Sequence, residues 1–505
     1  MNVMKQKIME SNGVIPIIRA NPIKKDVLSA SQSSLSSPKS KDEVLSMLLK
    51  AVVTVDFQAV ARLRRVAVDQ GLRQVHYKVY TVLELMKLVK KNNWGLCRKH
   101  GMTYLYNAAY WIMLEHDDMK AFLGDVADKM GVPHIMAHDI DFRERLLKQF
   151  ESSAHLQVQE PDGNKTLINL QNGTFEVHPD GFGLRGFSAD DFMTYQLPFA
   201  NDPEATAPIF MNYLHEVLPD KESQRLLAES CAYVFTNMNL EKALFLYGTG
   251  ANGKSVFYNV LTGLLGPDNC CSYSLSSLTS SANGYSRAML QNKLVNYASE
   301  ISGQIDEGLF KQLASCEALE ARHPYGRPFS ITNYAKMIFN GNKLPITKEH
   351  TEAFYRRFNI IPFTQTIQPD KQDKELAHKI IATELPGVFN WILEGLSRLI
   401  KQKDFSPCAA SEAMLTQYKL ESDSVAMFMN EKGYKHTLDK SFMLSELYRE
   451  YVTFCHEDGY RPVGKNGFSK RLIAAKFHVV RKNNGMIVYA ALTPTEPLAA
   501  KKEGE

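Results

Sequence analysis

The sequence predicts an α/β protein built around a P-loop nucleotide-binding core, with a mixed region before the core and a small basic module after it. Three observations lead to this class. A glycine-rich loop, "YGTGANGKSVF" at 247–257, joins an apolar strand to a helix. Strands and helices alternate over 240–365, and two helices followed by a hairpin are expected after residue 440.

Length and composition place the chain among ordinary globular proteins. Its 505 residues correspond to about three domains, and 44% hydrophobic residues allow packed cores. Seven cysteines form no C-x-x-C pair, which favours reduced thiols inside a cell. No run of about 18 apolar residues and no apolar leader occurs, so we expect a cytoplasmic protein with no membrane partner. The net charge of +4 is too small to identify a nucleic-acid partner, so local charge has to decide.

The N-terminal hundred residues divide into an arm and a helical region. Residues 1–41 are expected to form a disordered arm or linker, because 29–41 is rich in serine. Residues 42–95 repeat apolar side chains at spacings of three and four, which predicts a helical accessory region. Within it, "ARLRR" at 61–65 could touch nucleic acid, but a solvated helix face is the favoured interpretation.

Residues 96–240 predict a mixed α+β domain that leads into the strand before the glycine loop. Turn residues and apolar periodicity mark its elements. These are strands within 102–114, helices over 117–131 and 141–151, a hairpin turning at Asn172-Gly173, and two helices divided at Pro219-Asp220.

The glycine loop fits G-x-x-x-x-G-K-S/T in the strand–loop–helix context that this pattern requires. Glycines let backbone N–H groups turn toward phosphate oxygens, and the helix N-terminus adds a partial positive charge. Lys254 is placed to reach the β- and γ-phosphates, and the Ser255 hydroxyl to bind Mg²⁺. We therefore expect ATP and Mg²⁺ at Gly248, Thr249, Gly250, Ala251, Asn252, Gly253, Lys254, Ser255 and Val256.

Hydrolysis also needs polar groups at the ends of neighbouring strands. "KLVNYASEI" at 293–301 predicts a strand ending at Glu300, which could hold Mg²⁺ or polarise water, or could be an ordinary loop residue. The strand predicted within 335–345 ends near Asn342, whose amide could orient the attacking water and sense the γ-phosphate. Asn340 could take that role instead.

Two arginines precede the last predicted strand of the core, in "EAFYRRFNIIPF" at 352–363. Arg356 and Arg357 could pair surface carboxylates, or one could reach the γ-phosphate on a neighbouring subunit as an arginine finger. The pair is weak evidence alone. The four motifs in this order and spacing are strong evidence for an ATP-hydrolysing machine.

Between the second and third motifs, "EALEARHPYGRPFSI" predicts a hairpin with a basic, aromatic tip. Such a tip suits the central channel of a ring, where cations meet phosphates and aromatic rings stack on bases. A solvated surface hairpin is the alternative. The tip residues expected to contact DNA are His323, Tyr325 and Arg327.

The C-terminal module, 420–495, follows a predicted linker at 401–419. Helices over 441–459 and 464–477 and a hairpin turning near 483–485 give the layout of a winged helix. Between 461 and 482 there are seven basic residues and no acidic one. A winged helix used for protein contacts is the alternative to DNA binding. The candidate DNA contacts are Lys465, Lys470, Arg471, Arg481 and Lys482.

These motifs resemble those of the superfamily 3 helicases, and most closely the helicase half of the phage, plasmid and poxvirus primase–helicases. The resemblance covers roughly residues 100–490, through "LFLYGTGANGKSVF", "LVNYASEI", "MIFNGNKLP", "TEAFYRRFNIIPF", the region before the loop and the C-terminal module. It implies an AAA+ ATPase at 241–400 that assembles as a hexameric ring on single-stranded and forked DNA and moves 3′ to 5′. Residues 96–240 would then be the domain associated with such primase–helicases.

The resemblance also implies a role for single residues. Lys254 and Ser255 match the first motif, Glu300 the second, Asn342 the sensor and Arg357 the finger. The second motif usually carries paired acidic residues, whereas Ser299 precedes a lone Glu300 here. The group that polarises the water is therefore left open.

No primase site is expected in this chain. Asp139 and Asp141 are spaced as metal ligands, but acids before a helix are favoured at its N-terminus. A separate primase or replication protein is the expected partner, in a bacterial or phage-infected cell. A DNA-remodelling replication initiator or motor without processive unwinding is the alternative function. A nucleotide kinase is disfavoured, because it needs neither the sensor Asn, nor the arginine pair, nor the basic module. A non-catalytic DNA-binding regulator with a relict loop would show no ATP turnover, whereas the intact set of Lys254, Ser255, Glu300 and Arg357 predicts turnover.

Overall fold

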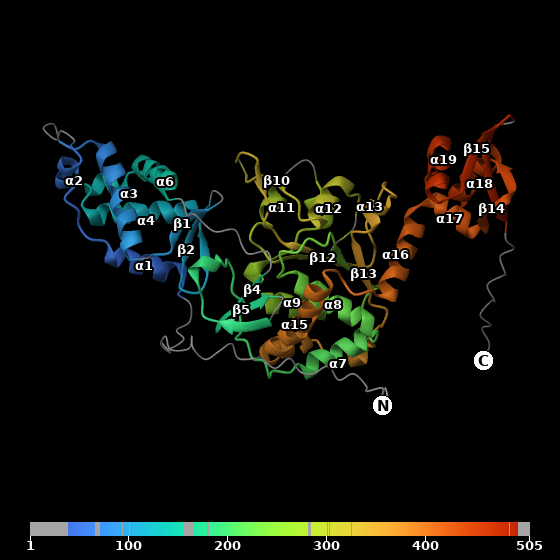
Figure 1. Cartoon of the computed structure of the whole chain (residues 1–505), viewed down its shortest axis with the longest axis horizontal. Helices are drawn as coiled ribbons and strands as arrows, with labels where there is room; N and C mark the ends of the chain where they lie inside the picture. Colours follow the sequence, from blue (N-terminus) through green and yellow to red (C-terminus); the bar gives the residue numbers. More distant parts are fainter. Residues whose placement is uncertain are drawn as a thin grey trace, which may run out of the picture.

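The computed structural model describes residues 39–65, 71–92, 94–99, 102–154, 165–178, 181–280, 284–299, 301, 303–324, 326–483 and 485–492. Three bodies follow one another along the longest axis of the molecule (Figure 1). Most of the predicted arm, at 1–38, lies outside the described residues, as do Glu300 and Tyr325. Within the described part of the chain, no helix has the length and apolar character needed to cross a bilayer.

The first body packs helices around one core, with a small antiparallel sheet beside them. The described residues of the predicted helical region at 42–95 are mainly helical, up to Lys91, and the predicted strands within 102–114 are confirmed. Asp139 caps a helix by accepting a hydrogen bond from the Phe142 N–H at 2.8 Å, as expected for an acid at a helix N-terminus. The elements are α1 Lys41–Ala51, α2 Phe57–Leu63, α3 Gln74–Lys91, β1 Leu96–Lys99, β2 Met102–Tyr106, β3 Trp111–Leu114, α4 His116–Met130, α5 His134–His138 and α6 Ile140–Ser153.

A three-stranded antiparallel sheet and two helices lead into the central body. The predicted hairpin is confirmed, but it turns one residue earlier, at Gln171-Asn172, because Leu170 pairs with Gly173. Asp220 caps the second helix, which confirms the division at Pro219-Asp220. The elements are β4 Thr166–Leu170, β5 Gly173–His178, β6 Gly181–Arg185, the short helix η2 Ala189–Asp191, α7 Pro208–Val217 and α8 Lys221–Tyr233.

A five-stranded sheet with the order β13-β7-β12-β9-β8 forms the centre of the molecule, and all of its strand pairs are parallel. Its strands are β7 Ala243–Tyr247, β8 Cys270–Cys271, β9 Val295–Ala298, β12 Lys336–Gly341 and β13 Phe358–Pro362. The connecting elements are α9 Lys254–Leu265, η3 Pro267–Asn269, α10 Leu275–Leu278, α11 Tyr285–Ala288, α12 Glu307–Ala314, the hairpin β10 Leu319–Ala321 and β11 Phe329–Ile331, and α13 Glu352–Tyr355.

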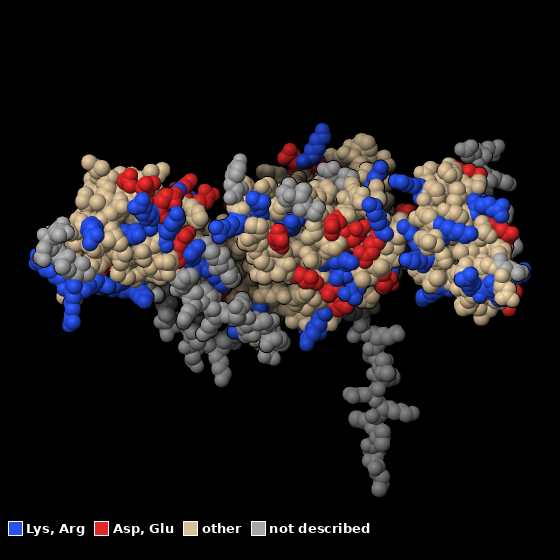
Figure 2. All heavy atoms as spheres, turned by 90° about the horizontal axis from the view of Figure 1, so that it is seen from above, with Lys and Arg blue, Asp and Glu red and all other residues tan. Residues whose placement is uncertain are grey.

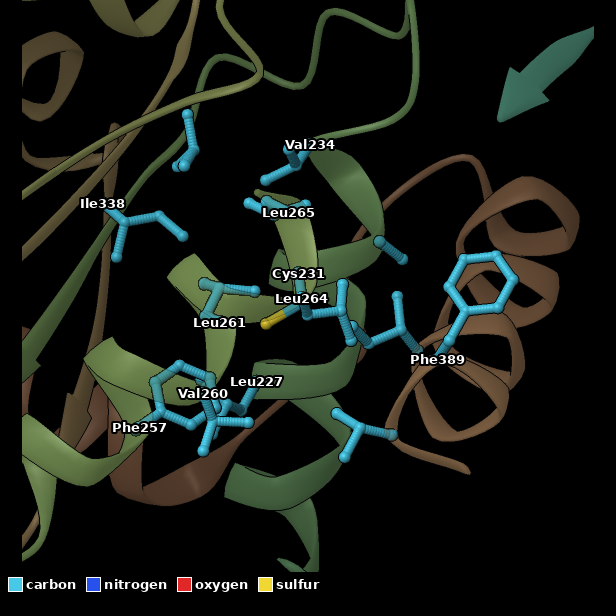
Figure 3. Packing of buried hydrophobic residues seen from close by; sticks show 14 of the residues in the cluster. Leu227, Cys231, Val234, Phe257, Val260, Leu261, Leu264, Leu265, Ile338 and Phe389 are labelled. Carbon is cyan, nitrogen blue, oxygen red and sulfur yellow. The ribbon is translucent and has the colours of Figure 1, made fainter. Parts of the chain in front are cut away.

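Successive side chains of the central strands point alternately into two hydrophobic cores, one on each face of the sheet. Leu244 and Leu246 join the core built with α8, α9 and α15, whereas Ala243 and Phe245 join the core on the opposite face. Figure 3 shows how side chains of α8 and α9 meet Phe389 of α15 in the first of these cores. Burial on both faces explains why these strands are continuously apolar in the sequence.

After the sheet, the chain continues through η4 Pro369–Lys371, α14 Leu376–Thr383, α15 Leu385–Gln402 and α16 Ala409–Ser422. Most of the predicted linker at 401–419 is therefore helical. The Ser411 hydroxyl accepts a hydrogen bond from the Ile360 N–H at 3.2 Å, and the Tyr418 hydroxyl donates to the Pro345 carbonyl at 2.7 Å. These contacts fix α16 against β13 and against the segment that follows β12.

The third body has its own core, formed by the apolar face of the predicted helix at 441–459. Both predicted helices and the hairpin are confirmed. A further strand, β14, pairs with β16 and was not expected from the sequence. The elements are α17 Ser424–Glu431, β14 Tyr434–Met443, α18 Leu444–Glu457, α19 Lys465–Ala474, β15 His478–Lys482 and β16 Gly485–Leu492.

Close packing of α15 on α8 gives a stability prediction. A Cβ at Gly395 would lie 2.6 Å from the carbonyl carbon of Ala228 and 2.8 Å from the Glu229 nitrogen, both of them backbone atoms. We expect Gly395→Ala to destabilise the chain by about 1–3 kcal/mol, because the two helices have to separate. Scanning calorimetry of the full chain measures the change.

The matched control is Gly467→Ala in α19, where the new Cβ would meet Val463 at an ordinary 3.5 Å. That change should be neutral or stabilising by up to about 1 kcal/mol. Equal melting temperatures for the Gly395 variant and the wild type would contradict the close-packing argument.

Candidate functional site

The glycine loop runs from the end of β7 to the start of α9, and its backbone takes conformations that favour glycine. Gly250 and Gly253 have φ values of +124° and +81°. A Cβ at Gly253 would lie 2.6 Å from Val217, and the Gly253 carbonyl accepts a hydrogen bond from the Tyr213 hydroxyl at 2.8 Å. Helix α7 therefore contacts the loop at Gly253, and the N–H groups of the loop stay available for an anion.

Lys254 is folded back across the loop. Its ammonium donates to the Gly248 carbonyl at 2.8 Å and to Asn252 Oδ1 at 2.6 Å. Burial lowers the pKa of Lys254. A phosphate would offer this half-desolvated cation a charged acceptor in place of two neutral ones, which is the basis for a strong charge-assisted contact.

Asn252 links the loop to the carboxyl end of the neighbouring strand β13. While its Oδ1 accepts from Lys254, its Nδ2 donates to the Phe363 carbonyl at 3.0 Å. The Ile367 N–H donates to the Ala251 carbonyl at 2.8 Å, so the segment after β13 is also hydrogen-bonded to the loop. The sequence offered Asn252 only as a loop member. Its partner lies 111 residues away, so local pattern gives no signal for its role.

The remaining loop residues differ in exposure. Thr249 and Ser255 are exposed, and Ser255 lies in the first turn of α9, where its hydroxyl is open to a bound ion. Val256 is half-buried and packs against the core. The loop N–H groups, the lysine and an exposed hydroxyl form a donor set that fits a nucleoside triphosphate with its Mg²⁺.

The carboxyl ends of three parallel strands meet beside this loop. Tyr247 pairs with Gly341 at the ends of β7 and β12, and Ala298, the last residue of β9, pairs with Phe339. Ser299 follows β9 and is exposed. Glu300 lies outside the described residues, so its role stays a prediction.

The two candidate sensor residues have different surroundings. Asn342 is exposed directly after Gly341, whose carbonyl accepts a hydrogen bond from the Gly248 N–H at 3.1 Å. Asn340 is buried within β12, next to Tyr297, a tyrosine whose pKa is raised by burial. Exposure beside the loop favours Asn342 as the group that meets a phosphate, and Asn340 as part of the sheet interior.

The arginine pair lies at the opposite edge of the same sheet. Phe358, directly after the pair, pairs with Ala243, while Pro362 pairs with Tyr247 beside the loop. Four residues of strand span about 13 Å. An arginine at the start of β13 is therefore placed away from the glycine loop of its own chain, which is the proposed phosphate-binding loop.

The hairpin β10–β11 is confirmed, and its described tip is partly packed. The His323 ring stacks on Phe329 with centroids 4.9 Å apart, whereas Arg327 is exposed. Arg322 is also exposed, and its Nε donates to the Gly326 carbonyl at 3.0 Å across the tip. Tyr325 lies outside the described residues. Arg322 was missed by the sequence analysis, although it lies in the quoted segment.

The basic residues of the third body fall into two groups. Lys465, Lys470, Arg481 and Lys482 are exposed, and Lys482 also lies 5.4 Å from the Tyr489 ring centroid. Arg471 instead pairs with Asp423 at 3.0 Å and joins α19 to α17, so its charge is engaged within the chain. Figure 2 shows several blue patches and fewer red ones on the mostly tan visible face of this body.

Three family models match separate parts of the chain. They are described as D5 N terminal like at residues 85–219, a family of unknown function (DUF5906) at 246–357 and Poxvirus D5 protein-like at 420–494. The first runs from α3 to α7, the second from β7 to the arginine pair, and the third from the end of α16 through β16.

Curated relatives carry helicase names. The helicase-named protein 121R of Invertebrate iridescent virus 3 is 24% identical over 312 residues, which are 54% of this chain and 32% of that protein. The helicase-named protein 184R of Invertebrate iridescent virus 6 is 24% identical over 324 residues, with the same shares. The chain thus spans about a third of the length of these relatives.

Solved structures give a looser likeness. Two apo structures of the NrS-1 C terminal region align with TM-scores of 0.45 and 0.46, at 12% and 13% identity. The alignments cover 81% and 82% of this chain, and 98% and 99% of those chains.

The contact between Lys254 and Asn252 gives a prediction for nucleotide binding. Asn252→Asp should lower the affinity for ATP by about tenfold or more, because a carboxylate would retain the lysine and repel the γ-phosphate. Fluorescence anisotropy with a labelled ATP analogue measures the affinity.

Asn252→Ala separates this charge effect from the loss of the Phe363 contact, and we expect it to bind ATP more tightly than the aspartate variant. Affinity that is equal in Asn252→Asp and the wild type would show that Lys254 does not exchange this partner for a phosphate.

Proposed function

We propose that the chain is an ATP-driven DNA helicase of the D5-like primase–helicase family, with a superfamily 3 helicase core. One observation supports the proposal above the others. The phosphate loop and the arginine pair lie at opposite edges of one parallel sheet, about 13 Å apart along the strands. A complete ATP site would therefore form between copies of the chain.

Such a head-to-tail contact closes into a ring when the rotation between copies fits. We propose a hexameric ring, with each nucleotide held by the loop of one copy and met by an arginine of the next. The family resemblance supports the copy number, 3′ to 5′ movement and DNA in the central channel. The hairpin tip, with exposed Arg322 and Arg327, is the proposed channel contact.

The proposed chemistry assigns one task to each group. Lys254 would bind the β- and γ-phosphates, and Asn342 would orient the attacking water. Ser255 and Glu300 would hold Mg²⁺, which when bound neutralises charge on the phosphates. Thr249 and Val256 would flank the phosphates. Release of Lys254 from Gly248 and Asn252 would couple nucleotide binding to a change in the loop.

The third body is the proposed winged-helix DNA-binding domain, and the central sheet the AAA+ core. Helix α19 presents exposed Lys465 and Lys470, and strand β15 of the hairpin presents exposed Arg481. We propose that these residues bind duplex or forked DNA ahead of the ring. A separate primase or replication protein is the proposed partner, and replication of a virus, phage, plasmid or other mobile element the proposed setting.

A second function is a replication initiator that remodels duplex DNA without processive unwinding. The observation that favours it is the separate core of the third body, joined to the ATPase by α16. A body of this kind can hold duplex DNA while the ring changes shape.

Strand displacement on forked DNA with ATP and Mg²⁺ tests the helicase proposal. The wild type should displace the strand, whereas Lys254→Ala should lose displacement and lower ATP turnover by about 10²-fold or more, since charge stabilisation at the phosphates is lost. The exposed Lys374 provides a matched control, and Lys374→Ala should behave as wild type.

DNA-stimulated ATP turnover without displacement on any fork would favour the remodelling initiator. Turnover that ignores DNA, again without displacement, would contradict both functions.

Exposed lysines of α19 give a separate prediction for DNA binding. The double change Lys465→Ala, Lys470→Ala should reduce the slope of log K against log [salt] by about two, because two phosphate contacts are lost. Filter binding at several salt concentrations measures the slope, and ATP turnover without DNA should stay at the wild-type rate.

Lys221→Ala with Lys374→Ala removes two exposed lysines of the central body and serves as the control. An unchanged slope in the α19 variant would assign this body to protein contacts instead.

A further inference from the structure

The two neighbouring arginines before β13 have opposite surroundings. The Arg356 side chain is 56% exposed, whereas the Arg357 side chain is 9% exposed. The family resemblance makes Arg357 the better match to a finger. A residue that reaches a phosphate on another copy has to leave its own surface, so this difference in burial bears directly on which arginine does so.

Arg357 is fixed from several sides. Its Nε and Nη2 donate to the Ser315 hydroxyl at 3.3 and 3.1 Å, and its Nη1 donates to the Ala353 carbonyl. Ser315 is fully buried at the C-terminal end of α12. The Arg357 carbonyl also accepts the Ala243 N–H at 2.8 Å, at the start of the β13–β7 ladder. Moving Arg357 outward would leave the buried Ser315 hydroxyl without its donor, which is costly.

Arg356 is held by one carboxylate at the surface. Its Nη2 lies 2.7 Å from Glu241 Oε2, and the same oxygen lies 3.4 Å from Arg357 Nη2. Glu241 has φ +54°, a left-handed conformation that is uncommon for glutamate. The backbone is therefore held in a costly turn that brings one carboxylate to both arginines.

An open hollow of about 320 Å³ adjoins this pair. It is lined by Asn239, Leu240, Glu241, Lys242, Arg356, Lys403 and Asp404. The space in front of Arg356 can therefore admit a group from another molecule.

We propose that Arg356 contacts the γ-phosphate on the neighbouring copy, and that Arg357 is a positioning residue. Glu241 holds Arg356 in the isolated subunit, and a phosphate replaces Glu241 when copies assemble. Because Arg357 stays beside Glu241, the carboxylate keeps a positive partner after Arg356 leaves. The inference rests on the proposed function, since it needs a second copy that presents its nucleotide to this edge.

Single variants of the full chain separate the two roles. Arg356→Ala should lower kcat for ATP by about 10³-fold, within the range of arginine fingers, and leave the melting temperature at the wild-type value. Arg357→Ala should lower the melting temperature by several degrees because Ser315 and Glu241 lose a partner. Any loss of kcat in Arg357→Ala should be partly recovered in Arg357→Lys, since an ammonium can still pair with Glu241.

Mixed rings test action in trans. Arg356→Ala subunits keep a working loop, and Lys254→Ala subunits keep a working arginine. At equal amounts, about one quarter of the interfaces join the two intact halves, so turnover should rise to about one quarter of wild type. Arg145→Ala, an exposed arginine with a carboxylate partner in α6, is the matched control and should retain wild-type kcat.

Each outcome decides between the roles. Wild-type turnover by Arg356→Ala, with an inactive Arg357→Ala that melts normally, overturns the inference and makes Arg357 the contact. Absence of recovery in mixed rings, with size-exclusion chromatography showing that they form, overturns action in trans. A wild type that hydrolyses no ATP overturns the proposed function, and the inference with it.

Discussion

Parallel pairing of β7, β12 and β13 is the constraint on which the rest of the structure depends. Parallel strands bring all their carboxyl ends to one edge of the sheet and all their amino ends to the other. The phosphate loop and Asn342 therefore share one edge, and the arginine pair is confined to the opposite one. In the proposed ring, each copy would therefore hold two halves of a site that it cannot join by itself.

In the isolated chain, the cationic side chains of both halves of the proposed site are bound by acceptors of the same chain. Lys254 is held by a carbonyl and an amide oxygen, and Arg356 by the carboxylate of Glu241. A phosphate is a stronger acceptor for Lys254 than neutral oxygens are, and Glu241 retains Arg357 when Arg356 leaves. Nucleotide and neighbour can thus replace these contacts without leaving a buried charge unpaired, which would be costly.

Local patterns predicted the elements well where one residue or one period decides them. Asp220 caps α8, the apolar face of 441–459 forms the core of the third body, and the hairpin at 319–331 has the expected pairing. Sequence patterns did not predict contacts between residues that lie far apart in the sequence. β14 pairs with β16, about fifty residues further along the chain, and Arg471 is bound by Asp423, the residue that caps α17.

The sequence by itself determined the phosphate loop, because glycine spacing, the lysine and the following helix are local requirements of one short segment. It also determined the alternation that leads to a parallel sheet. Only the tertiary structure decided which neighbour each polar group meets: Asn252 with Phe363, Asn340 inside the sheet, and Arg357 buried while Arg356 is exposed. Burial and pairing are set by residues far apart in the chain, so adjacent arginines with the same chemistry acquire different surroundings.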